Sequence, residues 1–435
     1  MAYSLARGIE GSKPDTDDER ASSNAGSPRG ILIGGSVNSS TAALMPATPD
    51  QIRSAVLDPN PEVQRVAIDY WTHAELHDPA VMPLVIRAIE RQRDEDYRVF
   101  SLLRSAEHLV QTPDTLAWLA GELQSPVAPD DIALENHHYA AALAILWADT
   151  ELLAQQHREI RELPGWPEPL NRLLDLRLCA HGWDWPRCRR ALFVLGEHML
   201  ARDEVQRQDQ HDERALIAAA TRHGEIAASD VYGLLKRGDS EDPDLADWLQ
   251  PVWVELAGRM GIERAIPLLI ECIDSGDEWT EDEIGPALGR IGTRKALLAV
   301  AHAWWDTGNP SSRIGLTEPL ERIKSDLALE RSLAFLEREE DLDVAVSLAG
   351  AALSHFDERA IEPCRRLVLG DEDELDPEEL GVRDELVAAA TVMGETFPEY
   401  DAWCEASRER EGRRPMMDDF RLAEAYTEAD PSREL

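Results

Sequence analysis

The chain has 435 residues, of which 84 are acidic and 44 basic, so its formal charge is −40 at pH 7. Such an acid excess repels nucleic acid and anionic lipid, which excludes polyanions as expected partners. No apolar run reaches the roughly 18 residues that a membrane-spanning helix needs, and the first residues carry no secretory pattern. We therefore expect a cytoplasmic protein that does not enter a membrane.

The cysteines point to the same compartment. They are odd in number and none belongs to a Cys-x-x-Cys pair, so they predict buried free thiols in a reducing environment and not a disulfide framework. The five are Cys179, Cys188, Cys272, Cys364 and Cys404.

Residues 1–47 have too little apolar content to fold alone, because Ser, Asn, Gly, Asp and Pro dominate them. We expect a disordered tail. Order begins with residues 48–124, where a capping side chain stands before a proline at four expected helix starts. These starts are Thr48-Pro49, Asn60-Pro61, Asp78-Pro79 and Thr112-Pro113. The last two prolines are 34 residues apart, which is the length of one helical hairpin repeat.

Residues 125–211 form a middle segment in which the repeat is hardest to follow, and we expect irregular helices there. Its aromatic and basic residues concentrate in one cluster: Trp166, Trp183 and Trp185 near Arg187, Arg189 and Arg190. One interpretation is a ligand pocket that stacks a ring or holds a carboxylate. The interpretation that we favour is a loop anchored by indoles, with arginines in solvent.

A metal site is not expected. Cys179, His181 and Cys188 come closest to a cluster, but zinc would need a fourth ligand. The adjacent His137 and His138 would point about 100° apart on a helix. No catalytic motif stands out and the carboxylates are too numerous to single out a pair, so we expect no cofactor and, on balance, no enzyme.

Residues 212–430 are predicted to form C-terminal helical repeats, clearest at residues 261–304. Three apolar stripes with helical spacing occur there, of which Ile284, Ala287, Leu288 and Ile291 are one. We expect a capping box at Thr280-x-x-Glu283, a helix end at Gly292 and a new start capped by Thr293. Gly289 is predicted to lie where neighbouring helices approach closely.

The run Leu288-Gly289-Arg290-Ile291-Gly292 ends a helix rich in small residues, and Glu-Arg-Ala recurs at helix starts in the middle and C-terminal parts. These residues resemble a HEAT-like repeat of the kind found in bilin lyases. The resemblance implies an all-α fold: a right-handed superhelix of about ten antiparallel hairpins.

Two functions remain open at this point. The leading hypothesis is a non-catalytic scaffold that binds a basic or mixed-charge protein partner through a concave helical surface. The acidic run Asp371, Glu372, Asp373 and Glu374 is its candidate docking edge. The alternative is a bilin-lyase-like enzyme or small-ligand-binding protein with a pocket on the concave face. A deep pocket where charged side chains converge would favour the alternative, and a shallow continuous groove would favour the scaffold.

Overall fold

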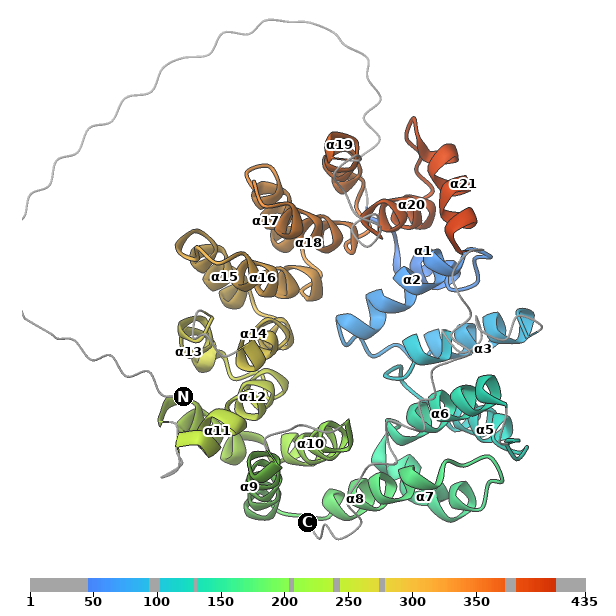
Figure 1. The fold of residues 1–435 in the computed structure, drawn as a ribbon, viewed down its shortest axis with the longest axis vertical. Helices are drawn as coiled ribbons and strands as arrows, with labels where there is room; N and C mark the ends of the chain where they lie inside the picture. The colour runs from blue at the N-terminus through green and yellow to red at the C-terminus, as the bar shows by residue number, and fades with distance from the viewer. Residues whose placement is uncertain are drawn as a thin grey trace, which may run out of the picture. The chain divides into compact units, whose positions relative to one another are not determined.

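The computed structural model describes residues 46–93, 102–128, 131–202, 207–237, 243–273, 278–371 and 381–411. These residues are helical throughout, apart from short turns, and contain no strand (Figure 1). The predicted all-α fold of stacked helical hairpins is therefore confirmed, while the right-handed sense of the superhelix stays a prediction. The expected tail of residues 1–47 lies almost entirely outside the described residues.

The first half of the described chain contains helices α1 to α10, among which α4 is not fully described. Their bounds are α1 (Pro49–Ala55), α2 (Pro61–His73), α3 (Val81–Arg91), α5 (Pro113–Glu122), α6 (Ile132–Leu146), α7 (Thr150–Arg161), α8 (Asn171–His181), α9 (Trp185–Arg202) and α10 (Arg207–Ala220).

The second half continues with helices of similar length. They are α11 (Gly224–Arg237), α12 (Pro243–Arg259), α13 (Ile266–Glu271), α14 (Glu278–Ile291), α15 (Arg294–Asp306), α16 (Pro310–Arg322), α17 (Asp326–Leu336), α18 (Leu342–Leu353), α19 (Ile361–Asp371), α20 (Gly381–Met393) and α21 (Tyr400–Glu411).

The helices stack in two layers. In the C-terminal half the even-numbered helices α12, α14, α16, α18 and α20 pack on one another in succession. The odd-numbered helices α13, α15 and α17 form a second row outside them (Figure 1). Each hairpin thus contributes one helix to an inner layer and one to an outer layer. The middle segment pairs in the same way, with α7 against α8 and α9 against α10, and its limits as a separate segment stay a prediction.

The stack of residues 46–411 closes on itself, which the sequence did not lead us to expect. Helix α20 packs against both α1 and α2, so the last repeats meet the first (Figure 1). The main-chain N–H of Ala47 donates to the carbonyl oxygen of Phe356 at 2.8 Å across this junction. We call the contact of α1 and α2 with the C-terminal repeats the seam.

The three predicted helices at residues 261–304 are present. Ile284, Ala287, Leu288 and Ile291 are all buried, as the stripe predicted. Gly292 ends α14 with a φ of +67°, and the side chain of Thr293 caps α15 by accepting from the N–H of Ala296.

The close approach expected at Gly289 is also present. A Cβ added there would lie 2.6 Å from Cδ of Arg322 on α16. Only glycine lets these two inner helices pack at this separation.

Two predicted helix starts are wrong. Thr280 does not cap α14, because the described helix begins at Glu278 and the threonine is buried inside it. Asp78 does not cap α3, which begins at Val81 without a side-chain cap. Its carboxylate instead accepts from the N–H of Ala80, which forms a turn. The helix therefore begins only after this turn, at Val81. The caps at Thr48, Asn60 and Thr112 are confirmed.

The cysteines are all free thiols, as predicted, but one burial prediction is wrong. Cys188, Cys364 and Cys404 are buried and Cys272 is half-buried, whereas Cys179 is exposed. The reason is local: Cys179 occupies the outward face of α8, between the buried Leu176 and Ala180. Among the described residues no helix is both long and apolar enough to cross a bilayer.

Candidate functional site: a charged cavity at the seam

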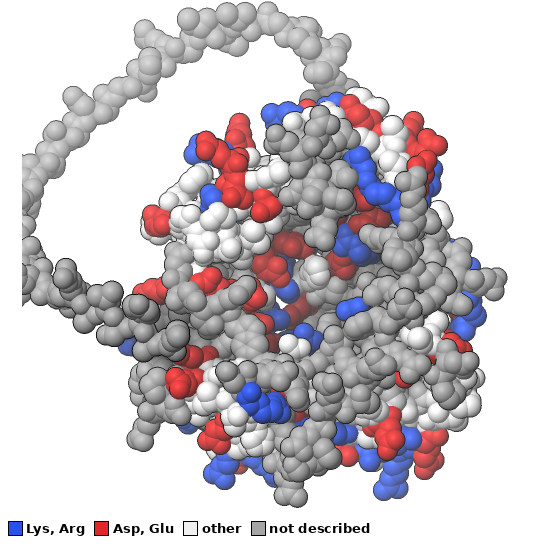
Figure 2. Space-filling model, viewed as in Figure 1, with Lys and Arg blue, Asp and Glu red and all other residues white. Residues whose placement is uncertain are grey.

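A cavity of about 770 Å³ opens on the inner layer, next to the seam. Its wall consists of α2 from the beginning of the chain and α14, α16, α18 and α20 from its second half. The volume falls in the range of about 300–1,000 Å³ that is usual for small-ligand sites. Figure 2 shows acidic and basic side chains together in the hollow at the middle of this face.

Carboxylates dominate the charged side chains that line this cavity. Asp69, Glu281, Asp282, Glu318, Glu321 and Glu385 face the cations Arg65 and Lys324, with His73 as the titratable member. The lining therefore carries a net charge of about −4 with a neutral histidine. The remainder is largely small or apolar, including Gly285, Gly350 and Ala351.

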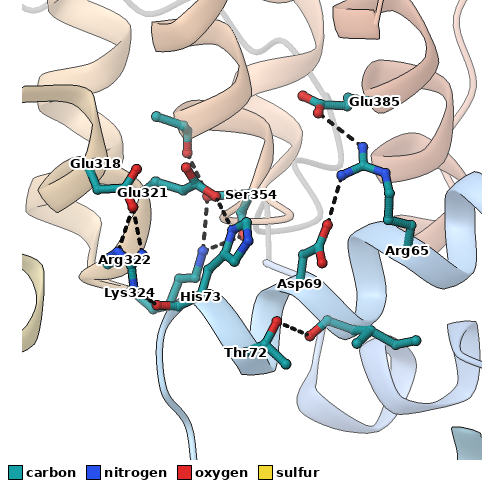
Figure 3. A network of polar contacts seen from close by, with 12 residues as sticks. Arg65, Asp69, Thr72, His73, Glu318, Glu321, Arg322, Lys324, Ser354 and Glu385 are labelled. Atoms are coloured by element: carbon teal, nitrogen blue, oxygen red, sulfur yellow. Dashed lines mark hydrogen bonds and ion pairs between the residues drawn. The ribbon is translucent and has the colours of Figure 1, made fainter. Parts of the chain in front are cut away.

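Arg65 joins the two ends of the chain on one side of the cavity. From α2 its Nη2 lies 3.1 Å from Oε1 of Glu385 on α20, while its Nη1 lies 2.8 Å from Oδ2 of Asp69 (Figure 3). Burial raises the pKa values of both Asp69 and Glu385, and the Arg65 charge opposes this rise. The cavity thus holds carboxyl groups whose pKa values are raised by burial and lowered by a neighbouring positive charge. Such perturbed pKa values are common at functional sites.

His73 and Glu321 make the second link across the seam. Nδ1 of His73, at the end of α2, lies 3.0 Å from Oε1 of Glu321 on α16. The hydrogen bond to Glu321 raises the histidine pKa. Burial would raise the pKa of Glu321, but the bond from His73 and the nearby cations outweigh it and lower that pKa to about 2. The pair is therefore an ion pair at neutral or mildly acidic pH whenever the histidine is protonated.

Arginines extend the seam on the same side. Nη1 of Arg322 donates to the main-chain oxygen of His73 at 2.6 Å, and its Nη2 lies 2.6 Å from Oε1 of Glu318 (Figure 3). Two residues beyond the end of α2, Glu75 accepts from Nε of Arg290 at 2.7 Å. The polar contacts thus continue from α16 to α14.

Backbone strain gathers at the seam as well. Among the described residues the non-glycine residues with positive φ are Glu75 and Phe356, both at +48°. Both follow a helix end, where Gly261, Gly292 and Gly394 serve in other repeats. A left-handed conformation costs a residue with a Cβ about 1–2 kcal/mol. Contacts made by the side chains of Glu75 and Phe356, which glycine could not make, offset this conformational cost.

The side chains of Glu75 and Phe356 both reach across the seam. Glu75 binds Arg290, while the ring of Phe356 lies 5.7 Å from that of Tyr70 and lines the cavity. The backbone strain therefore occurs where the two ends of the described chain contact each other. Strained residues persist where surrounding contacts hold them in place.

Lys324 is the second cation of the cavity. It lies in the turn between α16 and α17, and its Nζ donates to the main-chain oxygen and to Oγ of Ser354, each at 3.0 Å (Figure 3). Nζ also lies 5.1 Å from the ring centroid of Tyr70. Burial lowers the pKa of this amine to about 8, although the charge of Glu321 opposes the shift.

The predicted tryptophans of the middle segment serve local contacts. Trp166 donates Nε1 to Oδ1 of Asn171 at 3.1 Å, and Trp185 donates Nε1 to Oδ2 of Asp230 at 2.8 Å. Trp183 is half-buried. None of the three lines the charged cavity.

The predicted arginines lie around these indoles. The Arg187 guanidinium stacks 4.3 Å from the Trp183 ring centroid, and Arg189 lies 3.3 Å from the same carboxylate of Asp230. Arg190 is exposed. Arg187 is also exposed and Arg189 is half-buried, so the interpretation of the cluster as indole anchors stays a prediction.

The predicted docking edge falls mostly outside the described residues. Glu372, Asp373 and Glu374 belong to the undescribed stretch, and Asp371 is the last residue of α19 with an undescribed side chain. The structure therefore does not test that edge. No group of three or more metal-ligating side chains comes together in the described part of the chain.

Comparison of the sequence with protein-family models and with curated proteins finds no match. The cavity is therefore the feature from which a function can be inferred.

No motif or periodicity in the sequence marks the cavity residues as a group. A signal was present for two of the wall helices, because Pro286 and Pro319 lie inside α14 and α16 at an interval of 33 residues. Pro251 lies 35 residues before Pro286, inside the preceding inner helix α12. A proline at a fixed place in successive hairpins marks corresponding helices. That α2 would complete the wall has no comparable signal.

Proposed function

We propose that the protein is a recognition protein that takes up a cationic group in the charged cavity of its inner layer. The observation that supports this most is the convergence of charged side chains from four helices and from the turn after α16, drawn from both ends of the chain, on one cavity. By the criterion stated for the sequence, such convergence favours a ligand pocket over a shallow groove. We also propose that the hairpins are HEAT-like repeats, since inner and outer rows of antiparallel helices are typical of them.

The sign of the charge selects the ligand. A lining with a net charge of about −4 attracts ammonium and guanidinium groups and repels phosphates and carboxylates. The groups can come from a free polyamine or from the basic side chains of a protein segment. The second source agrees with the basic or mixed-charge partner proposed from the sequence, and in either case the role of the protein is binding and not catalysis.

Two probes separate the sources: spermidine for a free polyamine, and a short peptide of alternating glycine and arginine for a protein segment. Binding to the purified full chain is measured by isothermal titration calorimetry at low and at physiological salt. We expect at least one of the probes to bind with a one-to-one stoichiometry, and the tighter binder identifies the source. If neither probe saturates the protein at one-to-one stoichiometry, the proposal is contradicted.

The double variant Glu281→Gln/Glu318→Gln removes two carboxylates from the wall. Two unit charges at about 4 Å contribute roughly 1 kcal/mol each even in water, so the affinity should fall by about tenfold or more. The matched control, Glu263→Gln/Glu330→Gln, changes the net charge equally at two exposed positions outside the cavity. An equal loss of affinity in both variants would mean that the probes respond to the overall charge and not to the cavity.

A further inference from the structure

Lys324 has neutral hydrogen-bond partners although it lies among acids. Its Nζ donates to two oxygens of Ser354, and the nearby carboxylate of Glu321 is bound to His73 instead. No ion pair joins Lys324 to a carboxylate of the described residues. Lys324 nevertheless lines the cavity, and its amine lies beside Ser354 and Tyr70, which line it too, so a ligand there can reach the amine.

The composition of the chain makes a lysine at this position unusual. Of 44 basic residues only Lys13, Lys236, Lys295 and Lys324 are lysines, and the rest are arginines. An arginine could donate to the same two oxygens and stack on Tyr70. What arginine cannot provide is a neutral amine, because it stays protonated in proteins.

Burial makes that neutral amine available near physiological pH. With a pKa of about 8, roughly a quarter of the Lys324 side chains are uncharged at pH 7.5. An ordinary exposed lysine, with a pKa of about 10.4, is uncharged in only about one molecule in a thousand at this pH. The difference in nucleophile concentration is on the order of 200-fold.

We propose that Lys324 is a nucleophilic amine that forms a reversible imine with a carbonyl compound held in the cavity. The Nζ lone pair attacks the carbonyl carbon, and the carbonyl oxygen takes up a proton to give a carbinolamine. Loss of that hydroxyl as water, with departure of the second Nζ proton, leaves the C=N bond. The balance is one amine and one carbonyl giving one imine and one water, so no oxidant or reductant takes part.

The class of ligand follows if the proposed function also holds, on which this one point rests. A carbonyl compound that also bears an ammonium group would place the cation against Glu281, Asp282 or Glu318 and its carbonyl at Lys324. The cavity would then act on small cationic aldehydes or ketones. The competing interpretation is that Lys324 only satisfies the carbonyl oxygen of Ser354 at the end of α18.

Reductive trapping tests the inference without requiring cation recognition. The full chain is incubated at pH 7.5 with glycolaldehyde, which is neutral, and sodium cyanoborohydride, and the modified lysines are located by peptide mass spectrometry. Lys236 and Lys295 are exposed and serve as internal standards. We expect Lys324 to be modified at least about tenfold faster than either, after allowing for restricted access, and its rate to level off above about pH 8.

Modification of Lys324 at or below the rate of Lys295 would overturn the inference and leave the structural role alone. Lys324→Arg keeps the positive charge and should abolish the fast modification, whereas Lys295→Arg should not change it. Because the standards lie in the same wild-type chain, the comparison holds even if the Lys324 variant folds poorly.

A second arm separates this inference from the proposed function. Aminoacetaldehyde carries the ammonium group that glycolaldehyde lacks, so it should modify Lys324 faster than glycolaldehyde does. That advantage should disappear in Glu281→Gln/Glu318→Gln. Fast but equal modification by the two aldehydes would support the reactive lysine and contradict cation recognition. Slow modification by both would refute the lysine whatever the outcome with spermidine.

Discussion

Replacing Gly289 by alanine should destabilise the protein even though alanine favours helices. The new Cβ would lie 2.6 Å from Cδ and 2.9 Å from Cβ of Arg322, against the 3.5–4.0 Å of an optimal carbon contact. Arg322 cannot withdraw freely, because its guanidinium binds Glu318 and the main-chain oxygen of His73. Overpacking costs about 1–3 kcal/mol and the helical preference of alanine returns about 1 kcal/mol, so we expect a net loss of up to about 2 kcal/mol.

Gly315→Ala is the matched control on the facing helix α16. Its added Cβ would meet nothing closer than the carbonyl oxygen of Glu281 at 3.9 Å, so only the helical preference remains. This variant should be more stable than wild type by up to about 1 kcal/mol. Urea unfolding followed by circular dichroism measures both changes. If Gly289→Ala is as stable as Gly315→Ala, the packing of α14 on α16 is not as close as we describe.

Three further predictions concern charge. The raised pKa of His73 means that its bond to Glu321 stabilises the fold fully below about pH 6.5 and is lost as pH rises through the raised value, so the stability lost in His73→Gln should shrink between pH 6 and 9. A constant loss would contradict this. Arg65→Gln should lower the free energy of unfolding by about 1–2 kcal/mol, since the ion pairs of Arg65 are partly exposed. It should also speed amide hydrogen exchange in α2 and α20 more than in α12. Equal acceleration in all three helices would show that the effect is not local to the seam. Raising salt from 0.05 to 1 M should raise the melting temperature, because screening of the −40 charge outweighs the loss of partly buried pairs; a fall would show the reverse.

Much of the local structure could be predicted because its causes are local. The stripe of Ile284, Ala287, Leu288 and Ile291 needs only a periodicity of 3.6 residues, and each of its members is buried. The cap at Thr112 needs only a hydroxyl and the next three residues. Thr280 shows the limit of such reasoning, since a cap and an ordinary buried threonine within a helix have the same local sequence.

The cavity could not be predicted because its residues meet only through the closure of the stack. Arg65 and Glu385 are 320 residues apart, and His73 and Glu321 are separated by 248. Neither pair leaves a periodic signal, and a chain with 84 acids offers very many possible partners for any arginine. The positive φ of Glu75 could not be predicted either. Helix ends with positive φ are usually recognised by a glycine or an asparagine, and here the residue is a glutamate.

The seam differs physically from the other contacts of the inner layer. Between α12 and α14 the backbones meet directly, since a Cβ on Gly258 would lie 2.6 Å from Cα of Ala287. At the seam, partly exposed ion pairs such as Arg65 with Glu385 lie beside apolar contacts such as that of Tyr70 with Phe356, and the ion pairs gain little over water. We therefore expect the polar side of the seam to open more readily than the contact between α12 and α14. Because α2 and α20 both line the cavity, such an opening would also widen the entrance for a ligand.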